Sequence, residues 1–129
     1  DASELTLAKL EEIREEGYLR DKPGVIHCFD YDTTVAKEFQ KYDFLFGVDG
    51  PVTFKNGADK RELVKYLDAS EILLETDCPY MAPEPFRGKQ NEPSLLFEIA
   101  KKIADEKEMG IVELARITSE NGKKIFKIN

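Results

Sequence analysis

Residues 71–80, EILLETDCPY, carry a run of branched apolar residues directly into two carboxylates, a cysteine and a proline. The apolar run has the length and composition of a buried β-strand, which we predict over residues 71–77. Pro79 lacks a backbone N–H and cannot continue the strand. The strand therefore ends on Glu75 and Asp77, which lie either where the chain turns into solvent or where chemistry takes place.

Two further apolar runs, GVIHCF at 24–29 and FLFGVDG at 44–50, have the same character and predict two more buried strands. Amphipathic patterns separate them and predict helices over residues 3–16, 33–41, 58–67, from 93 to 110, and about 111–126. Strands that alternate with helices indicate parallel pairing and an α/β architecture. Three strands are fewer than a complete barrel or doubly wound sheet needs.

Composition sets the broad class of protein. The chain has 129 residues, a net charge of −7 and one histidine, so it cannot hold a self-contained histidine-rich metal site. Its acidity argues against binding nucleic acid through a basic surface, although an enzyme that presents metal ions to phosphate remains compatible. Neither a membrane-spanning run nor a signal peptide is recognisable, and two cysteines without a CxxC pattern predict a reduced, cytoplasmic setting. A chain that starts with Asp1 is expected to be processed, cropped or part of a longer protein.

Polar residues follow each predicted strand, and the carboxyl ends of parallel strands share one face, where active sites form. His27 and Asp77 are the leading candidates there, because imidazole and carboxylate both bind divalent transition metals. Side chains alternate along a strand. If His27 and Asp77 face the site, Cys28 and Cys78 are expected to face the helix layer as small apolar residues.

Each of these residues also has a structural interpretation. A lone histidine in an apolar strand is commonly a hydrogen-bonded core residue. Asp30 and Asp49 are equally suited to turns, and Glu75 is equally suited to an ion pair with a lysine or arginine. The basic stretch at 87–89 is either a solvated surface or a phosphate contact. Residues 78–92, rich in proline and polar residues, are expected to form an irregular loop.

Five motifs occur together in the order and spacing of one family. They are GVIHCF, GPVTFKN, ILLETDCPY, APEPFRGKQNEP and ITSENGKKIF. The chain resembles, from about residue 1 to residue 127, the TatD family of metal-dependent deoxyribonucleases. The resemblance implies a TIM-like (β/α)8 hydrolase that holds divalent ions at the carboxyl face of its strands. It also implies hydrolysis of phosphodiesters, typically the trimming of DNA from its 3′ end.

The resemblance assigns roles to four residues. His27 and Asp77 match metal-ligand positions, and Asp77 is also placed to orient or deprotonate the attacking water. Arg87 and Asn91 match positions in the loop that borders the substrate site. The metal itself, whether Mg, Mn or Zn, stays open.

Two departures from the family matter. Residues 30–32 are DYD, where the family usually has a small stretch with glycine, often SGS, and the change adds negative charge where a phosphate would approach. The family's opening half, with its His-x-His or His-x-Asp pair, a glutamate and another histidine, has no counterpart in this sequence. We therefore expect residues 1–129 to form a single partial domain, the C-terminal half of a barrel. Its two ligands would hold a metal weakly at best, and its open strand edges would invite pairing.

Three functions remain, in order of preference. The first is half of a TatD-like metallo-DNase, inactive until a parent chain, a partner or an associated fragment supplies the N-terminal half. The second is a non-catalytic half-barrel that forms homo-oligomers or pairs with another chain through its edges. The third is another amidohydrolase-like metalloenzyme, acting on an ester or lactone, against which the RGKQNEP loop argues.

Overall fold

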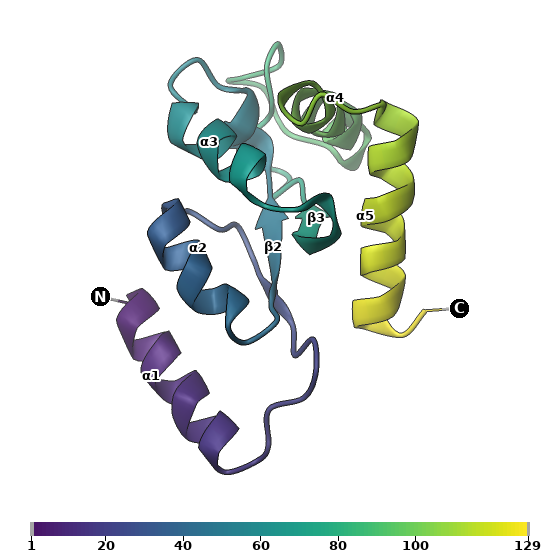
Figure 1. Cartoon of the computed structure of the whole chain (residues 1–129). Coiled ribbons are helices and arrows are strands. Elements are labelled where there is room, and N and C mark those ends of the chain that lie inside the picture. The colour runs from purple at the N-terminus through teal and green to yellow at the C-terminus, as the bar shows by residue number, and fades with distance from the viewer. Residues whose placement is uncertain (1, 129) are drawn as a thin grey trace.

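A three-stranded parallel sheet lies at the centre of the computed structural model, which describes residues 2–128 (Figure 1). The strands are β1 (Val25–Ile26), β2 (Leu45–Val48) and β3 (Ile72–Leu74), in the order β1-β2-β3. Both pairings are parallel, with Val25 opposite Leu45 and Phe46 opposite Ile72. The prediction of parallel strands alternating with helices is confirmed, although each strand is shorter than its apolar run.

Helices precede, separate and follow the strands. They are α1 (Ala2–Glu15), α2 (Thr33–Gln40), α3 (Ala58–Tyr66), α4 (Leu96–Glu106) and α5 (Ile111–Phe126), with short 3₁₀ turns at η1 (Gly50–Thr53), η2 (Ala69–Glu71) and η3 (Pro93–Leu95). In Figure 1, α1, α2 and α3 lie on one side of β2, whereas α5 lies on the other. None of the helices in residues 2–128 is long and apolar enough to cross a membrane.

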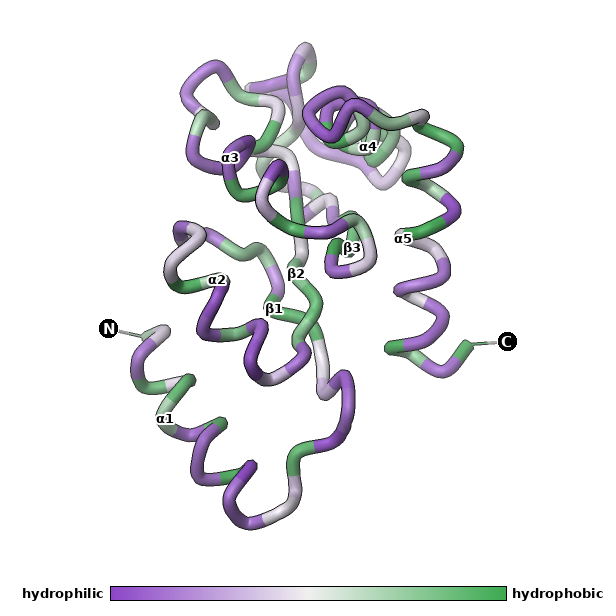
Figure 2. Tube along the Cα trace, in the orientation of Figure 1, coloured by the Kyte–Doolittle hydropathy of each residue, from purple (hydrophilic) through white to green (hydrophobic). Residues whose placement is uncertain are grey.

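The core forms where the strands meet the inner faces of the helices. Phe29 packs edge-on against Phe39 and Phe46, with ring centroids 6.2 and 5.0 Å apart, a favourable aromatic geometry. Ile99 and Ile103 of α4 are fully buried in the same core. Figure 2 shows the consequence: the apolar colour follows the strands, and the polar colour follows the outer turns of the helices.

The predicted end of α4 at Gly110 is wrong by four residues. The helix ends at Glu106, and Glu108 takes the left-handed conformation with φ 51°. This lets the Met109 N–H reach back to the Ala104 carbonyl at 3.0 Å and satisfy a carbonyl that the helix leaves open. Gly110 instead precedes α5.

The two outer strands differ in how they are covered. β1 and β3 are the sheet edges, as the sequence predicted. At β3, α5 packs against the strand, and the buried Asn121 amide donates to the carbonyls of Ala69 and Ile72, both at 2.9 Å. Part of the β3 edge is therefore covered by the chain's own last helix.

Candidate metal centre

The carboxyl ends of the three strands bring four polar side chains together. His27 follows β1, Asp49 follows β2, and Glu75 and Asp77 follow β3. Backbone hydrogen bonds hold these segments side by side beyond the strands: the Phe29 N–H donates to the Gly47 carbonyl at 3.1 Å, and the Glu75 N–H donates to the Val48 carbonyl at 3.0 Å. Parallel pairing thus gathers residues that are distant in sequence.

The His27 ring lies between two carboxylates. Its Nδ1 is 2.9 Å from Glu75 Oε2, and its Nε2 is 3.3 Å from Asp77 Oδ1. The hydrogen bond to Glu75 is the main cause of a raised His27 pKa, and the charge of Asp77 adds to it. The His27 side chain is 68% exposed, so it is not the buried core histidine that the alternative interpretation required.

Glu75 is a site residue that the sequence singled out at a strand end but to which we assigned no role in the metal site. Its Oε2 accepts hydrogen bonds from both the His27 ring and the Cys28 N–H, the latter at 2.8 Å. The carboxylate lies directly over Gly47, where an added Cβ would be 2.1 Å from Oε2. The alternative interpretation of Glu75, an ion pair with a lysine or arginine, does not hold among residues 2–128. A glycine inside an apolar strand was the available signal of a close approach.

The orientation predicted for the cysteines is wrong. The Cys28 thiol faces the site, where Sγ donates to Asp49 Oδ2 at 3.3 Å, and Cys78 is exposed. The alternation rule fails because β1 ends at Ile26, and Cys28 and Asp77 both adopt positive φ, 46° and 55°. Burial raises the pKa of the Cys28 thiol to about 12, so the group is a neutral donor rather than a nucleophile.

Asp49 is a buried carboxylate, not a solvated turn residue. It is 1% exposed, and this burial raises its pKa, while the Cys28 hydrogen bond and the nearby Lys60 charge oppose the shift. Ligand atoms of Cys28, Asp49 and Asp77 lie within 4.8 Å of one another, as do those of His27, Glu75 and Asp77. Asp77 belongs to both groups and is the centre of the arrangement.

The geometry around His27 fits a divalent metal. Neighbouring ligands in a tetrahedral shell with bonds of 2.0–2.1 Å lie about 3.3 Å apart, which matches the 3.3 Å between His27 Nε2 and Asp77 Oδ1. Metal-bound histidines usually donate their other ring N–H to a carboxylate. Glu75 stands in that place, so it orients the imidazole.

The two loop residues predicted to contact substrate lie in different environments. The exposed Arg87 stacks its guanidinium 4.2 Å from the centre of the Phe54 ring and donates to Asn56 Oδ1 at 3.4 Å. Asn91 is 2% exposed, and its amide donates to the carbonyls of Thr76 and Tyr80. Arg87 thus presents charge at the surface, whereas Asn91 shapes the loop from within.

Known proteins share both the sequence and the fold. Over 117 residues the chain is 46% identical to the uncharacterized metal-dependent hydrolase YabD of Bacillus subtilis, covering 91% of this chain and 46% of the relative. It is 36% identical to the uncharacterized metal-dependent hydrolase YcfH of Escherichia coli, covering 100% of this chain and 47% of the relative. The chain therefore spans about half the length of these curated relatives.

A solved structure shows the same architecture. The TatD homologue YjjV of Escherichia coli superposes with a TM-score of 0.85 at 22% identity, over 98% of this chain and 47% of that one. The fold is therefore about half of a TatD-type, TIM-like barrel. Residues 1–127 match the family described as TatD related DNase. With motifs, strand order and sequence identity in agreement, the chain belongs to the TatD family.

Proposed function

We propose that this chain forms the C-terminal half of the catalytic centre of a metal-dependent phosphodiester hydrolase that trims DNA from its 3′ end. The observation that carries the proposal is the 3.3 Å approach of His27 Nε2 to Asp77 Oδ1 at the carboxyl ends of parallel strands. The half-length match to relatives named metal-dependent hydrolases supports it.

His27 and Asp77 would hold the metal, and Glu75 would orient the imidazole by accepting a hydrogen bond from its Nδ1–H group. When bound, a divalent metal lowers the pKa of its water and offsets charge on the phosphate. The Asp77 carboxylate would orient that water and accept its proton. Arg87, held over Phe54, offers a cation to the substrate backbone.

Two ligands hold a metal weakly, so we propose that the chain is inactive until a second half contributes the remaining ligands. The test mixes the pure 129-residue chain with the N-terminal half of the Bacillus subtilis relative. A 5′-labelled single strand of DNA is then incubated with Mg²⁺, Mn²⁺ or Zn²⁺. We expect 3′ trimming by the mixture and no cleavage by either half alone.

The controls separate activity from folding. Asp77→Asn should abolish cleavage by the mixture, whereas Asp105→Asn, which removes an exposed carboxylate on α4, should retain it. Robust cleavage by the chain alone that disappears in Asp77→Asn would contradict the proposed dependence on a second half. A folded, metal-loaded complex of the two halves that leaves DNA and other phosphodiesters intact would contradict the activity itself.

A second candidate is a half-barrel that associates through its sheet edges without catalysis. Val25 and Ile26 of the edge strand β1 are only half-buried. Val25 also lines a pocket of about 540 Å³, together with Leu73, Leu74, Phe126 and the metal-centre residues His27 and Glu75. An unpaired strand edge next to an apolar hollow favours pairing with a second copy or with a partner half. Light scattering decides this point, because a well-folded monomer at high concentration would remove the case for self-association.

A further inference from the structure

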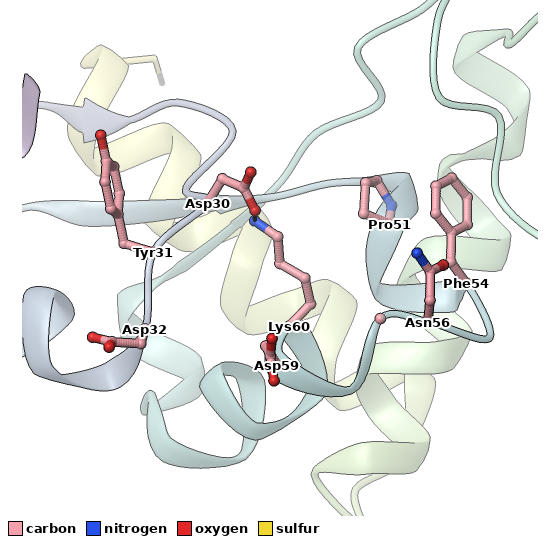
Figure 3. A pocket seen from close by; sticks show the side chains of 9 residues that line it. Asp30, Tyr31, Asp32, Pro51, Phe54, Asn56, Asp59 and Lys60 are labelled. Carbon is pink, nitrogen blue, oxygen red and sulfur yellow. Dashed lines mark ion pairs between the residues drawn. The ribbon is translucent and has the colours of Figure 1, made fainter.

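A pocket of about 310 Å³ is lined in part by the segments that follow the metal-centre residues His27 and Asp49 in the chain. Asp30 and Tyr31, soon after His27, line one side, and Pro51 and Phe54, soon after Asp49, line the other. Figure 3 shows these two sides with the Lys60 side chain reaching between them from α3 toward Asp30. The pocket therefore shares two chain segments with the candidate metal centre.

Lys60 is the only cation among the residues that line this pocket, and its charge is already engaged. Its ammonium is 2.9 Å from Asp30 Oδ1 and also donates to the Phe29 carbonyl. The Lys60 side chain is 12% exposed, whereas that of Asp30 is 83% exposed. The largely buried ammonium is thus paired with an exposed carboxylate.

The rest of the pocket is negative or uncharged. Asp32 and Asp59 contribute two further carboxylates to the lining. With Lys60 paired to Asp30, a phosphate that enters meets like charge from the lining itself. A further cation, Arg87, lies outside the lining, stacked on Phe54 and bonded to Asn56. Tyr31 and Phe54 offer ring surfaces, and carboxylates accept hydrogen bonds from hydroxyls, so an uncharged nucleoside is the complementary ligand.

We propose that Asp30 is a specificity-determining residue: by holding Lys60, it closes this pocket to phosphate and reserves it for the uncharged nucleoside end of a substrate. This inference rests on the proposed function only in naming a nucleic-acid end as the ligand. The selectivity of the pocket is measured with small probes that are not hydrolysed, so its test is independent of the nuclease activity.

The first experiment measures binding of inorganic phosphate to the full chain by the shifts of backbone amides around residues 29–32 and 56–60. The wild-type protein should bind phosphate weakly or not at all at this position. Asp30→Asn should raise the affinity at least about tenfold, because it removes a like charge and frees an ammonium within contact distance. The double variant Asp30→Asn/Lys60→Met should lose this gain.

Asp59→Asn is the matched control, because it removes the same unit of charge from the same pocket without releasing Lys60. Its gain should be clearly smaller than that of Asp30→Asn. Equal gains in the two variants, or a gain that survives Lys60→Met, would overturn the role of the ion pair. The amide spectrum of each variant shows whether the fold is intact before binding is compared.

A second pair of probes tests the ligand class. Thymidine should shift the pocket amides of the wild-type protein more strongly than thymidine monophosphate does, and Asp30→Asn should reverse this order. Preference of the wild-type pocket for the monophosphate, or no response to thymidine, would contradict the proposed selectivity. Neither result depends on whether the chain, alone or complemented, cleaves DNA.

Discussion

Gly47→Ala tests whether the Glu75 carboxylate takes its position because residue 47 has no side chain. An added Cβ would lie 2.1 Å from Oε2, 2.2 Å from Cδ and 2.3 Å from Oε1 of Glu75, far inside contact distance. The carboxylate must therefore move. We expect this displacement to break its hydrogen bonds to the Cys28 N–H and the His27 ring, at 2.8 and 2.9 Å.

The expected loss of stability follows from these two contacts. The partly buried bond from the Cys28 N–H to a carboxylate contributes about 1.5–3 kcal/mol, and the exposed His27 pair contributes about 0.5 kcal/mol after solvent screening. Alanine gains about 0.5–1 kcal/mol over glycine in a strand. The free energy of unfolding should fall by about 2 kcal/mol, which lowers Tm by roughly 8 °C in a chain of this size.

Urea unfolding followed by circular dichroism measures the loss. Gly122→Ala is the matched control, because its Cβ would meet only Leu73 Cδ2 at an ordinary 3.6 Å. Because Gly122 lies inside α5, that change should leave stability unchanged or raise it. In a Glu75→Ala background, Gly47→Ala should cost less than about 0.5 kcal/mol because the clash is gone. If Gly47→Ala lowered stability by the full amount of about 2 kcal/mol in the Glu75→Ala background, or not at all in the otherwise wild-type protein, the proposed contact between Gly47 and Glu75 would be refuted.

Three further predictions concern the same end of the sheet. An NMR titration of His27 should give a pKa above its ordinary 6.5. The ion pair therefore stabilises the fold below pH 6.5, and this stabilisation is lost as pH rises through the raised pKa. Glu75→Gln should lower the His27 pKa again, and an unchanged pKa would contradict the contact. Asp77→Asn should weaken Zn²⁺ binding to the chain by at least about tenfold in calorimetry, whereas Asp105→Asn should not. Iodoacetamide at pH 8 should alkylate the exposed Cys78 and spare Cys28, whose thiol pKa is raised to about 12. Equal labelling of both cysteines in the folded protein would be inconsistent with the partly buried Cys28–Asp49 contact.

The sequence predicted the architecture because its signals are periodic and local. Apolar runs marked the three strands, and the alternation with helices gave their parallel direction. The approach of His27 to Asp77 follows from the same rule, since carboxyl ends of parallel strands converge. Their assignment as metal ligands stays a prediction that the Zn²⁺ experiment tests.

The remainder of the site could not be predicted because it depends on where regular structure stops. Once β1 ends at Ile26 and Cys28 takes a positive φ, side-chain alternation no longer says which way Cys28 points. The Glu75–Gly47 contact joins different strands, and no pattern within one strand encodes it beyond the glycine itself. The Asp30–Lys60 pair likewise joins a loop to a helix thirty positions later.

The hydrogen bonds by which Asn121 covers part of the β3 edge can form only late in synthesis. Asn121 bonds the carbonyl of Ile72 across 49 positions of sequence. At about 5–20 residues per second, a ribosome needs roughly 2–10 s to extend the chain from Ile72 to Asn121. Throughout that interval β3 has its neighbour β2 but lacks its cover. Until α5 emerges, the β3 edge of the nascent chain is therefore open to mispairing, as the β1 edge is.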